Sequence, residues 1–188
     1  MAEPVAALAG LSASAGSGRV SLGEVSAGTI LRVQTWPDTA EAFRRVARDV
    51  IDIEAPPLGS AATKSDVTVA ALAPSTYVVS GLHEEMAWLV QEALSASDAA
   101  VTDWSHGRTL LSLQGEAAAH VLQKCVAIDL AAFPPGRAAA TMIHHIDVLI
   151  LHPAETEFRL LVLRSLAEAL AEWLLDAGLE EGIGFRPR

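Results

Sequence analysis

The predicted order of strands and helices occurs twice in this chain, and this repeat limits the possible folds more than any other feature. Residues 31–34, LRVQ, are matched in the second half by residues 111–114, LSLQ. A helical stripe of apolar residues is also matched at a constant offset, so that Leu82, Met86, Leu89, Val90 and Ala93 correspond to Leu166, Leu170, Trp173, Leu174 and Ala177. Self-similarity of this kind indicates related supersecondary units. We therefore expect an α+β fold of two related βαββα(β) halves sharing a core.

The first half is predicted to follow the order of a split βαβ unit. Strand character begins near Val20 and is clearest over residues 29–34. Asp38, followed three positions later by Glu41, predicts the N-cap of a helix that carries Phe43, Val46, Ala47 and Val50 on one stripe. Pro and Gly predict a loop over 54–65. The other expected elements are strands over 67–73 and 75–80, a helix over 82–94 and a strand beginning at Ala99.

The second half is expected to repeat this order. It should contain a turn at 105–107, a strand over 108–113, and a helix with Ala118, Leu122, Cys125 and Val126 on one face. Strands over 141–150 and 158–163 should be joined around Pro153, and Ser165 with Glu168 should cap the last helix. The expected division of the chain is a flexible N-terminal tail (1–18), a first half (19–104), a second half (105–180) and a C-terminal tail (181–188).

Composition excludes several classes of partner and cellular location. The 188 residues carry 13 Lys and Arg against 23 Asp and Glu, a net charge of −10, so there is no basic stripe to bind nucleic acid or an anionic membrane. A single cysteine excludes an intrachain disulfide framework. The N-terminus lacks the basic region of a signal peptide, and no apolar run reaches the ~18 residues of a membrane span. We expect a cytoplasmic protein.

Asp103, Ser105 and His106 are the residue types of a hydrolytic triad. Side chains on an extended segment alternate between faces, and working triads assemble from distant positions. The sequence also lacks the G-x-S-x-G turn that would expose a nucleophilic serine. We therefore assign no catalytic residue.

His144 and His145 suggest a metal site, with Asp147 or His152 as a further ligand. Adjacent side chains on a strand point to opposite faces, so the two histidines cannot easily bind one ion. His145 and Asp147 would share a face, which keeps the hypothesis open. A half-exposed or interface face is the more usual setting for such residues, and we assign no metal ligand.

The remaining candidates also have ordinary structural explanations. Cys125 is expected to be a buried, inert thiol on its helix. The glycines at 107, 115 and 136 form no phosphate-binding motif, so no cofactor-binding residue is assigned. Trp88 falls off the inward stripe of its helix, and Trp104 lies opposite Asp103 on its strand. Each tryptophan can anchor a partner or simply contribute to packing.

Several separated signatures nevertheless resemble one family in the same order. They comprise Asp103, Ser105, Gly107 and Arg108, then Leu113, Gly115 and Ala118, then Val121, Leu122, Lys124, Cys125, Asp129 and Leu130, followed by Thr141 and the strand to Ile150, Arg164-Ser165, and Glu172-Trp173-Leu174. Over about residues 65–180 the chain resembles the gamma subunit of heterotetrameric sarcosine oxidase.

The resemblance implies an aminomethyltransferase (glycine cleavage T-protein) fold without the C-terminal barrel domain. It implies a non-catalytic structural subunit of a flavoenzyme that oxidatively demethylates sarcosine or a related N-methyl amino acid. The partners would be the alpha subunit with NAD and tetrahydrofolate, the beta subunit with FAD and FMN, and the delta subunit with zinc. No cofactor is expected on this chain, and the substrate and the electron acceptor stay open.

The alternative is a free-standing folate-binding protein of the aminomethyltransferase superfamily. A related folate-binding repair family has a Lys-Gly-Cys motif followed by an aromatic residue. Lys124-Cys125-Val126 lacks both the glycine and the aromatic residue, which favours the subunit.

Overall fold

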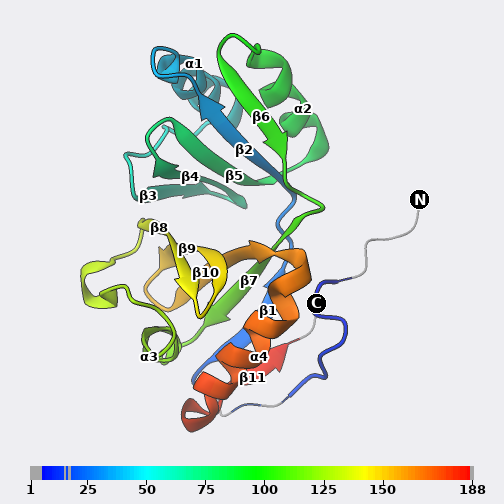
Figure 1. Ribbon diagram of the computed structural model, residues 1–188, viewed down its shortest axis with the longest axis vertical. Coiled ribbons are helices and arrows are strands. Elements are labelled where there is room, and N and C mark those ends of the chain that lie inside the picture. Colours follow the sequence, from blue (N-terminus) through cyan, green and yellow to red (C-terminus); the bar gives the residue numbers. More distant parts are fainter. Residues whose placement is uncertain (1–5, 15, 17, 187–188) are drawn as a thin grey trace. The chain divides into compact units, whose positions relative to one another are not determined.

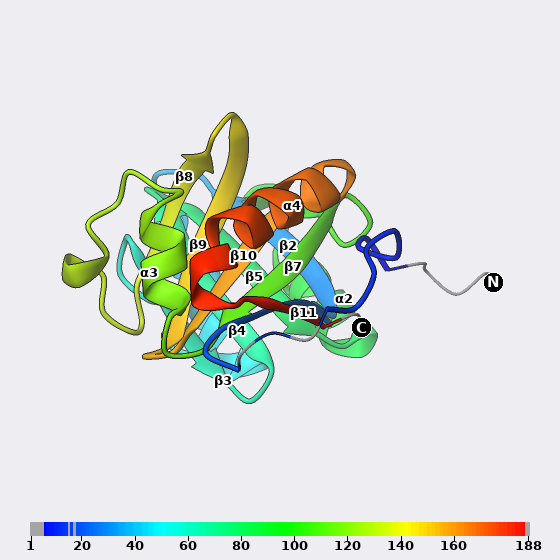
Figure 2. The ribbon, with the colours of Figure 1, turned by 90° about the horizontal axis from the view of Figure 1, so that it is seen from below.

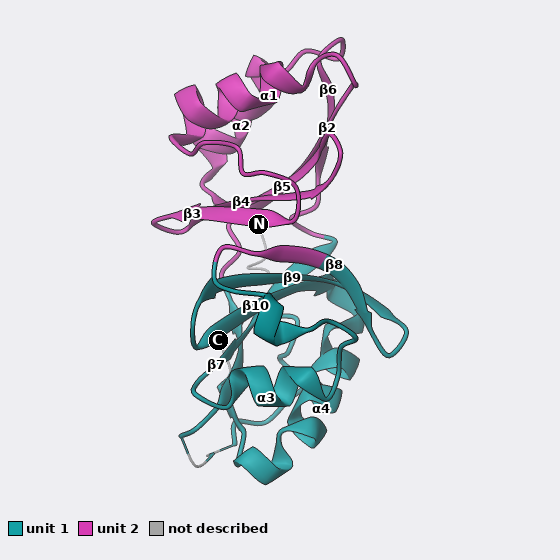
Figure 3. Ribbon diagram, turned by 90° about the vertical axis from the view of Figure 1, so that its left-hand side faces the viewer, with its two compact units in different colours: residues 1–25, 107–135, 140–188 teal, residues 26–106, 136–139 magenta. Residues whose placement is uncertain are grey.

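The computed structural model describes residues 6–14, 16 and 18–186, and the chain divides into two compact units (Figures 1 and 3). Unit 1 comprises residues 1–25, 107–135 and 140–188, and unit 2 comprises residues 26–106 and 136–139. Each unit has its own β-sheet and its own helices. The predicted α+β class is therefore confirmed.

Unit 1 is built on a six-stranded sheet in the order β11-β1-β7-β10-β9-β8. Its strands are β1 (Ser21–Val25), β7 (Arg108–Gln114), β8 (Ala138–Ile143, whose first two residues are assigned to unit 2), β9 (Ile146–Ala154), β10 (Glu157–Leu163) and β11 (Gly184–Arg186). Its helices are α3 (Ala118–Gln123) and α4 (Ala167–Ala177), with short 3₁₀ turns η2 (Leu130–Ala132), η3 (Arg164–Leu166) and η4 (Leu179–Glu181). Both α-helices cover the same face of the sheet (Figures 2 and 3).

Both ends of the described chain are built into unit 1, which corrects the expected tails. Leu8 is 2% exposed, and Ser14 forms a β-bridge with Phe185. In the expected C-terminal tail, β11 pairs in parallel with β1. The rest of the tail prediction falls on residues 1–5, 15, 17 and 187–188, which lie outside the described residues.

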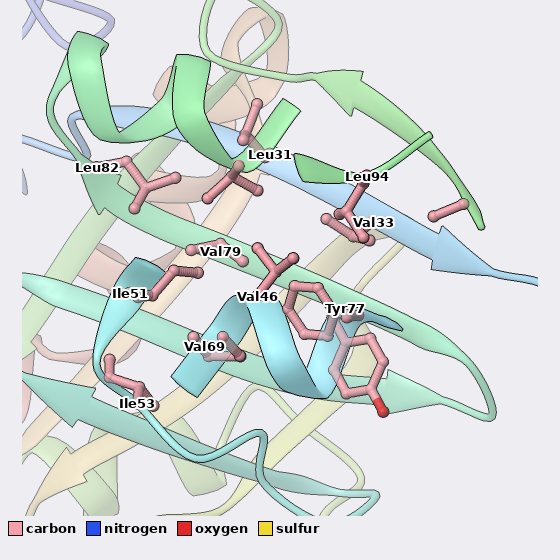
Figure 4. Packing of buried hydrophobic residues seen from close by; sticks show 14 of the residues in the cluster. Leu31, Val33, Val46, Ile51, Ile53, Val69, Tyr77, Val79, Leu82 and Leu94 are labelled. Atoms are coloured by element: carbon pink, nitrogen blue, oxygen red, sulfur yellow. The ribbon is translucent and has the colours of Figure 1, made fainter. Parts of the chain in front are cut away.

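Unit 2 is built on a five-stranded sheet in the order β3-β4-β5-β2-β6. Its elements are β2 (Thr29–Thr35), α1 (Ala40–Val46), the π-helical turn η1 (Ala47–Ile51), β3 (Ser60–Lys64), β4 (Val67–Ala73), β5 (Thr76–Leu82), α2 (Glu84–Ala93) and β6 (Ala99–Asp103). Alternate strand residues, among them Leu31, Val33 and Val79, meet Phe43 and Val90 of the helices in one apolar cluster (Figure 4). Phe43 also contacts Tyr77, with ring centroids 4.3 Å apart.

Two local predictions in unit 2 were wrong. The expected loop over 54–65 contains β3, which pairs with β4 as a hairpin whose turn includes Ser65 at φ +54°. Its sequence, SAATK, has little β propensity, so pairing with β4 decides its conformation. The first helix is preceded by Thr39 rather than capped by Asp38, and the Thr39 hydroxyl bonds to the Asp98 carbonyl.

The buried stripe of α2 also differs from the predicted one. Ala87 and Val90 are buried, but Leu89 is 42% exposed and Ala93 is exposed as well. The helix begins at Glu84 because the His83 side chain accepts a hydrogen bond from the Met86 backbone N–H. Leu89 therefore lies beside Trp88 on the outer face of the helix.

In unit 1 the predicted strand over 141–150 is in fact a hairpin. β8 ends at Ile143 and β9 begins at Ile146, with His144 in the left-handed region at φ +52°. β9 then runs through Pro153, so its turn into β10 lies at residues 155–156 and not at the proline. Pro153 lies where the register between β9 and β10 shifts, an irregularity that tolerates proline.

The helices of unit 1 also depart from their predicted ends. α3 stops at Gln123, so Cys125 lies beyond the helix and not on its stripe. Ser165 falls in η3 and makes no cap for α4, which begins at Ala167. The buried face of α4 consists of Ala167, Leu170, Ala171 and Leu174, while Trp173 is only half-buried.

Candidate functional site

The turn after β6 brings Asp103 and Ser105 together, and their hydrogen bonds stabilise the turn. The Ser105 hydroxyl donates to the Asp103 carboxylate at 2.5 Å and accepts from the Ile30 backbone N–H at 2.9 Å. The Ser105 backbone N–H donates to the same carboxylate at 2.8 Å. These bonds fix the exit of β6 beside the start of β2. Both hydrogen bonds of the hydroxyl therefore go to Asp103 and Ile30, and His106 is exposed.

The two adjacent histidines lie on the β8–β9 turn and contact one tryptophan. The rings of His144 and His145 lie 4.0 Å and 5.2 Å from the Trp173 ring, centroid to centroid. Asp147 instead interacts with Arg108, where burial lowers the pKa of the guanidinium and the nearby carboxylate partly opposes that shift. Over residues 6–14, 16 and 18–186, no three His, Cys, Asp or Glu side chains are grouped closely enough to hold a metal ion.

His152, the other proposed metal ligand, is a buried core residue on β9. Its Nδ1 lies 2.6 Å from the Phe133 carbonyl oxygen, so the ring donates a hydrogen bond there. The ring also stacks on Phe158, with centroids 4.2 Å apart. This arrangement fastens the segment after η2 to the sheet.

Cys125 is a half-buried thiol with a weak partner. Its Sγ lies 3.6 Å from the Val121 carbonyl oxygen. Burial raises the pKa of the Cys125 thiol, and the nearby Lys124 ammonium only partly offsets that rise. A thiol that stays protonated near neutral pH is a poor nucleophile.

Sequence reasoning missed two buried carboxylates in unit 1. Glu24, 8% exposed, accepts hydrogen bonds from the Leu8 backbone N–H at 3.1 Å and the Thr109 hydroxyl at 2.7 Å. The signal was present, because Val20, Leu22 and Glu24 alternate on one side of the strand and the first two are apolar.

Glu181 is the second buried carboxylate and the centre of a small ionic network. Its carboxylate forms an ion pair with Arg19 at 2.7 Å and a hydrogen bond with Nδ1 of His120 at 2.5 Å. Beside it, Lys124 donates to Glu180 at 2.9 Å, and this hydrogen bond lowers the pKa of the Glu180 carboxyl. These contacts join the segment before β1, α3 and η4 within unit 1.

The glycines at 107, 115 and 136 have backbone roles. Gly115 has φ +134°, and a Cβ there would collide with the Arg19 carbonyl oxygen. The carbonyl of Gly107 accepts from the Arg164 N–H at 3.0 Å, and that of Gly136 accepts from the Ala61 N–H at 2.8 Å. Gly136 also has a positive φ, +87°, which favours glycine, whereas the carbonyl hydrogen bond of Gly107 could be made by any residue.

The two tryptophans differ. Trp104 is half-buried with the Arg32 guanidinium 5.7 Å from its ring centroid, whereas Trp88 is 58% exposed, as predicted for a residue off the inward stripe. Two surface grooves of unit 1 lie beside β1, with Ser21 and Arg186 in both, and one of them is lined mainly by small residues. Neither groove contains one of the candidate catalytic or metal-ligating residues.

No helix in the described part of the chain is long and apolar enough to cross a membrane.

Comparisons with known proteins converge on one group of relatives. The GCVT N-terminal domain family matches residues 59–185. The sarcosine oxidase gamma subunit of Corynebacterium sp. (strain U-96) is 32% identical over 167 residues, which cover 87% of this chain and 81% of that protein. The gamma subunit from Arthrobacter sp. is 37% identical over 90 residues, covering 47% of this chain and 44% of that protein.

Solved structures agree with these relatives. A chain of the heterotetrameric sarcosine oxidase from Corynebacterium sp. U-96, in complex with pyrrole 2-carboxylate, matches with a TM-score of 0.78 and 29% identity, covering 89% of this chain and 88% of that chain. The glycine cleavage system aminomethyltransferase T from Bartonella henselae matches with a TM-score of 0.67 and 18% identity, covering 89% of this chain and 48% of that chain. The second match bears on the fold alone, and it confirms the predicted aminomethyltransferase-like fold.

Proposed function

Because the chain belongs to the GCVT N-terminal domain family and, within it, to the gamma subunits of sarcosine oxidase, we propose that it is a structural, non-catalytic subunit of a heterotetrameric flavoenzyme. The observation that carries this proposal is the joint similarity in sequence and fold over nearly the whole chain to a subunit of such an enzyme. The enzyme would oxidatively demethylate sarcosine or a related N-methyl amino acid.

Within this proposal the chemistry belongs to other chains. The alpha subunit would bind NAD and tetrahydrofolate, the beta subunit FAD and FMN, and the delta subunit zinc. The assembly would work in the cytoplasm. The division of this chain into halves at residues 19–104 and 105–180 is likewise proposed, as the trace of an ancestral repeat.

The side chains of this chain support a structural role. Ser105 is committed to Asp103 and Ile30, while His152 is committed to the Phe133 carbonyl. A nucleophile needs a base within hydrogen-bond reach, and an acid or base needs access to a substrate. The contacts of these residues serve the fold instead.

The test is turnover of the assembled enzyme. Ser105→Ala, His106→Ala and Cys125→Ser should each leave kcat within about twofold of the wild type, because none is placed to act on a substrate. A thousandfold fall in kcat with assembly preserved, about 4 kcal/mol of barrier, would place an active site on this chain.

A further inference from the structure

The outer face of α2 exposes a large apolar pair. Trp88 is 58% exposed and the adjacent Leu89 is 42% exposed, while Ala87 and Val90 of the same helix are buried in the core of unit 2. The other exposed large apolar residues of the described chain lie one to an element or loop, at Trp36, Leu58, Met142, Leu163 and Leu179. Trp36 already has a partner, since its Nε1 donates to the Ala96 carbonyl at 3.1 Å.

Carboxylates surround this pair. On an α-helix, residues three and four apart are neighbours on the surface. Trp88 therefore has Glu84 and Glu92 above and below it, and Leu89 has Glu85 and Glu92 in the same positions. All three glutamates are exposed, and the last turn of α2 carries no basic residue. The surface is an apolar centre with an acidic rim.

The acidic rim decides which occupant fits. A second copy docked symmetrically would bring the same carboxylates together, and like charges across an interface are costly. Nucleic acid and anionic membranes are repelled by the same charges and by the net charge of −10. A protein surface with Arg or Lys around an apolar recess satisfies both the centre and the rim, since exposed tryptophans that enter such recesses are frequent anchors of protein interfaces.

We propose that Trp88 and Leu89, with Glu84, Glu85 and Glu92, form the docking surface for another subunit, which presents an apolar recess rimmed by basic residues. This inference rests on the proposed function, because it requires a heteromeric complex. The indole and the leucine side chain supply the buried contact. The carboxylates set orientation and rate of association, so binding through this surface weakens as ionic strength rises.

The test uses the full chain, affinity-tagged and co-expressed with the alpha, beta and delta subunits of its own complex, with each recovered subunit quantified by mass spectrometry. We expect Trp88→Ala/Leu89→Ala to lower subunit recovery at least about tenfold, because truncating anchor residues costs more than 1.4 kcal/mol of binding. Leu58→Ala and Leu179→Ala, which remove other exposed leucines, should leave recovery unchanged.

A charge reversal provides an independent arm. Glu92→Lys inverts the rim at the C-terminal end of α2, where a cation is favourable to the helix, so folding is preserved. It should also lower recovery, whereas Glu172→Lys on the exposed side of α4 should not. Thermal unfolding of each purified variant checks that the chain is folded.

The outcomes separate this inference from the proposed function. If the wild-type chain recovers no other subunit, the proposed function fails and this inference fails with it. If the wild type recovers the subunits and both α2 variants recover them equally well, the inference alone is wrong. Recovery of a second copy of this chain that is lost in the double variant would also contradict it.

Discussion

Glu24 shows how one buried side chain holds residues that the sequence indicates as a tail. Its carboxylate accepts from the Leu8 N–H and from the Thr109 hydroxyl, and so joins the N-terminal residues to β7. Hydrogen bonds to charged groups contribute about 1.5–3 kcal/mol, and an abandoned buried donor adds a desolvation cost. The position is therefore a sensitive probe of whether the N-terminal segment belongs to unit 1.

Glu24→Ala should lower the free energy of unfolding by about 2–4 kcal/mol, measured by denaturant titration. Glu24→Gln should lose less than half as much, because the amide can accept from Leu8 while the Thr109 hydroxyl reverses to accept from the amide N–H. Glu41→Gln on an exposed carboxylate is the control and should change stability by less than about 0.5 kcal/mol. An alanine variant as stable as the wild type would show that residues 6–14 do not stay on the unit.

Cys125 provides a second residue-scale prediction, based on pH. Because burial raises the pKa of its thiol, the folded chain holds less thiolate at a given pH than the unfolded chain does. Alkylation in native buffer should therefore be slower than in denaturant, and its rate should rise at a higher pH. The raised pKa also means that the thiol favours folding at neutral pH and loses that contribution as pH rises into the alkaline range. Fast alkylation of the native chain at pH 7 would contradict this description.

At the scale of elements, α4 is held by its aliphatic residues more than by its tryptophan. Leu170 is fully buried, whereas Trp173 is half-buried against the two turn histidines. Leu170→Ala should therefore cost about 2–5 kcal/mol, and Trp173→Ala should cost less than the ~3–5 kcal/mol expected of a fully buried aromatic residue. Thermal or denaturant unfolding of the two variants, compared with Leu179→Ala on the surface, orders the three effects. If Trp173→Ala lowers stability most, then α4 turns Trp173 rather than Leu170 towards the sheet, which would contradict this description.

The link between β7 and α3 depends on Gly115. Its φ of +134° is strained for any side chain, and the collision of a Cβ with the Arg19 carbonyl adds to that strain. Gly115→Ala should cost more than about 3 kcal/mol. Gly18→Ala is a matched control, since Gly18 also has positive φ, +87°, but nothing lies within 4 Å of its Cβ position. Its cost should stay near the ~1–2 kcal/mol of the conformation alone. Equal losses would mean that the close approach to Arg19 is unimportant.

Element types were more predictable than element ends. Short runs of β-branched and leucine residues located β2, β4, β5 and β7, whose middle residues are mostly buried. β3 could not be found in this way, because SAATK becomes a strand only by pairing with β4. The His144-His145 turn was hidden because neither residue is a common turn former, and their contacts with Trp173 come from a distant helix. The predicted cap of the first helix was wrong for a similar reason, because the Thr39 hydroxyl donates to the carbonyl of Asp98, which is far along the chain.

At the scale of the whole molecule, the internal repeat and the family signatures predicted the fold class. The net charge of −10 predicts that nucleic acid is not a partner. Local patterns could not predict that each unit is assembled from segments that are far apart in the sequence. β1 lies in the predicted first half of the chain, but it pairs with β7 and β11, which come much later in the sequence. Such long-range pairing leaves no local signal. The roles of Ser105 and His152 were likewise fixed by distant partners, Ile30 and Phe133.

The central claim is that this chain works as a structural subunit, and native mass spectrometry of the affinity-tagged chain purified with its co-expressed partners tests it most directly. The expected result is a single heteromeric assembly that contains this chain with flavin-, folate- and zinc-binding subunits and oxidises sarcosine or a related N-methyl amino acid. The chain isolated from its partners should bind none of these cofactors stoichiometrically and should tend to aggregate, because docking surfaces are then uncovered. A stable monomer that joins no other subunit and binds tetrahydrofolate tightly by itself would contradict the account.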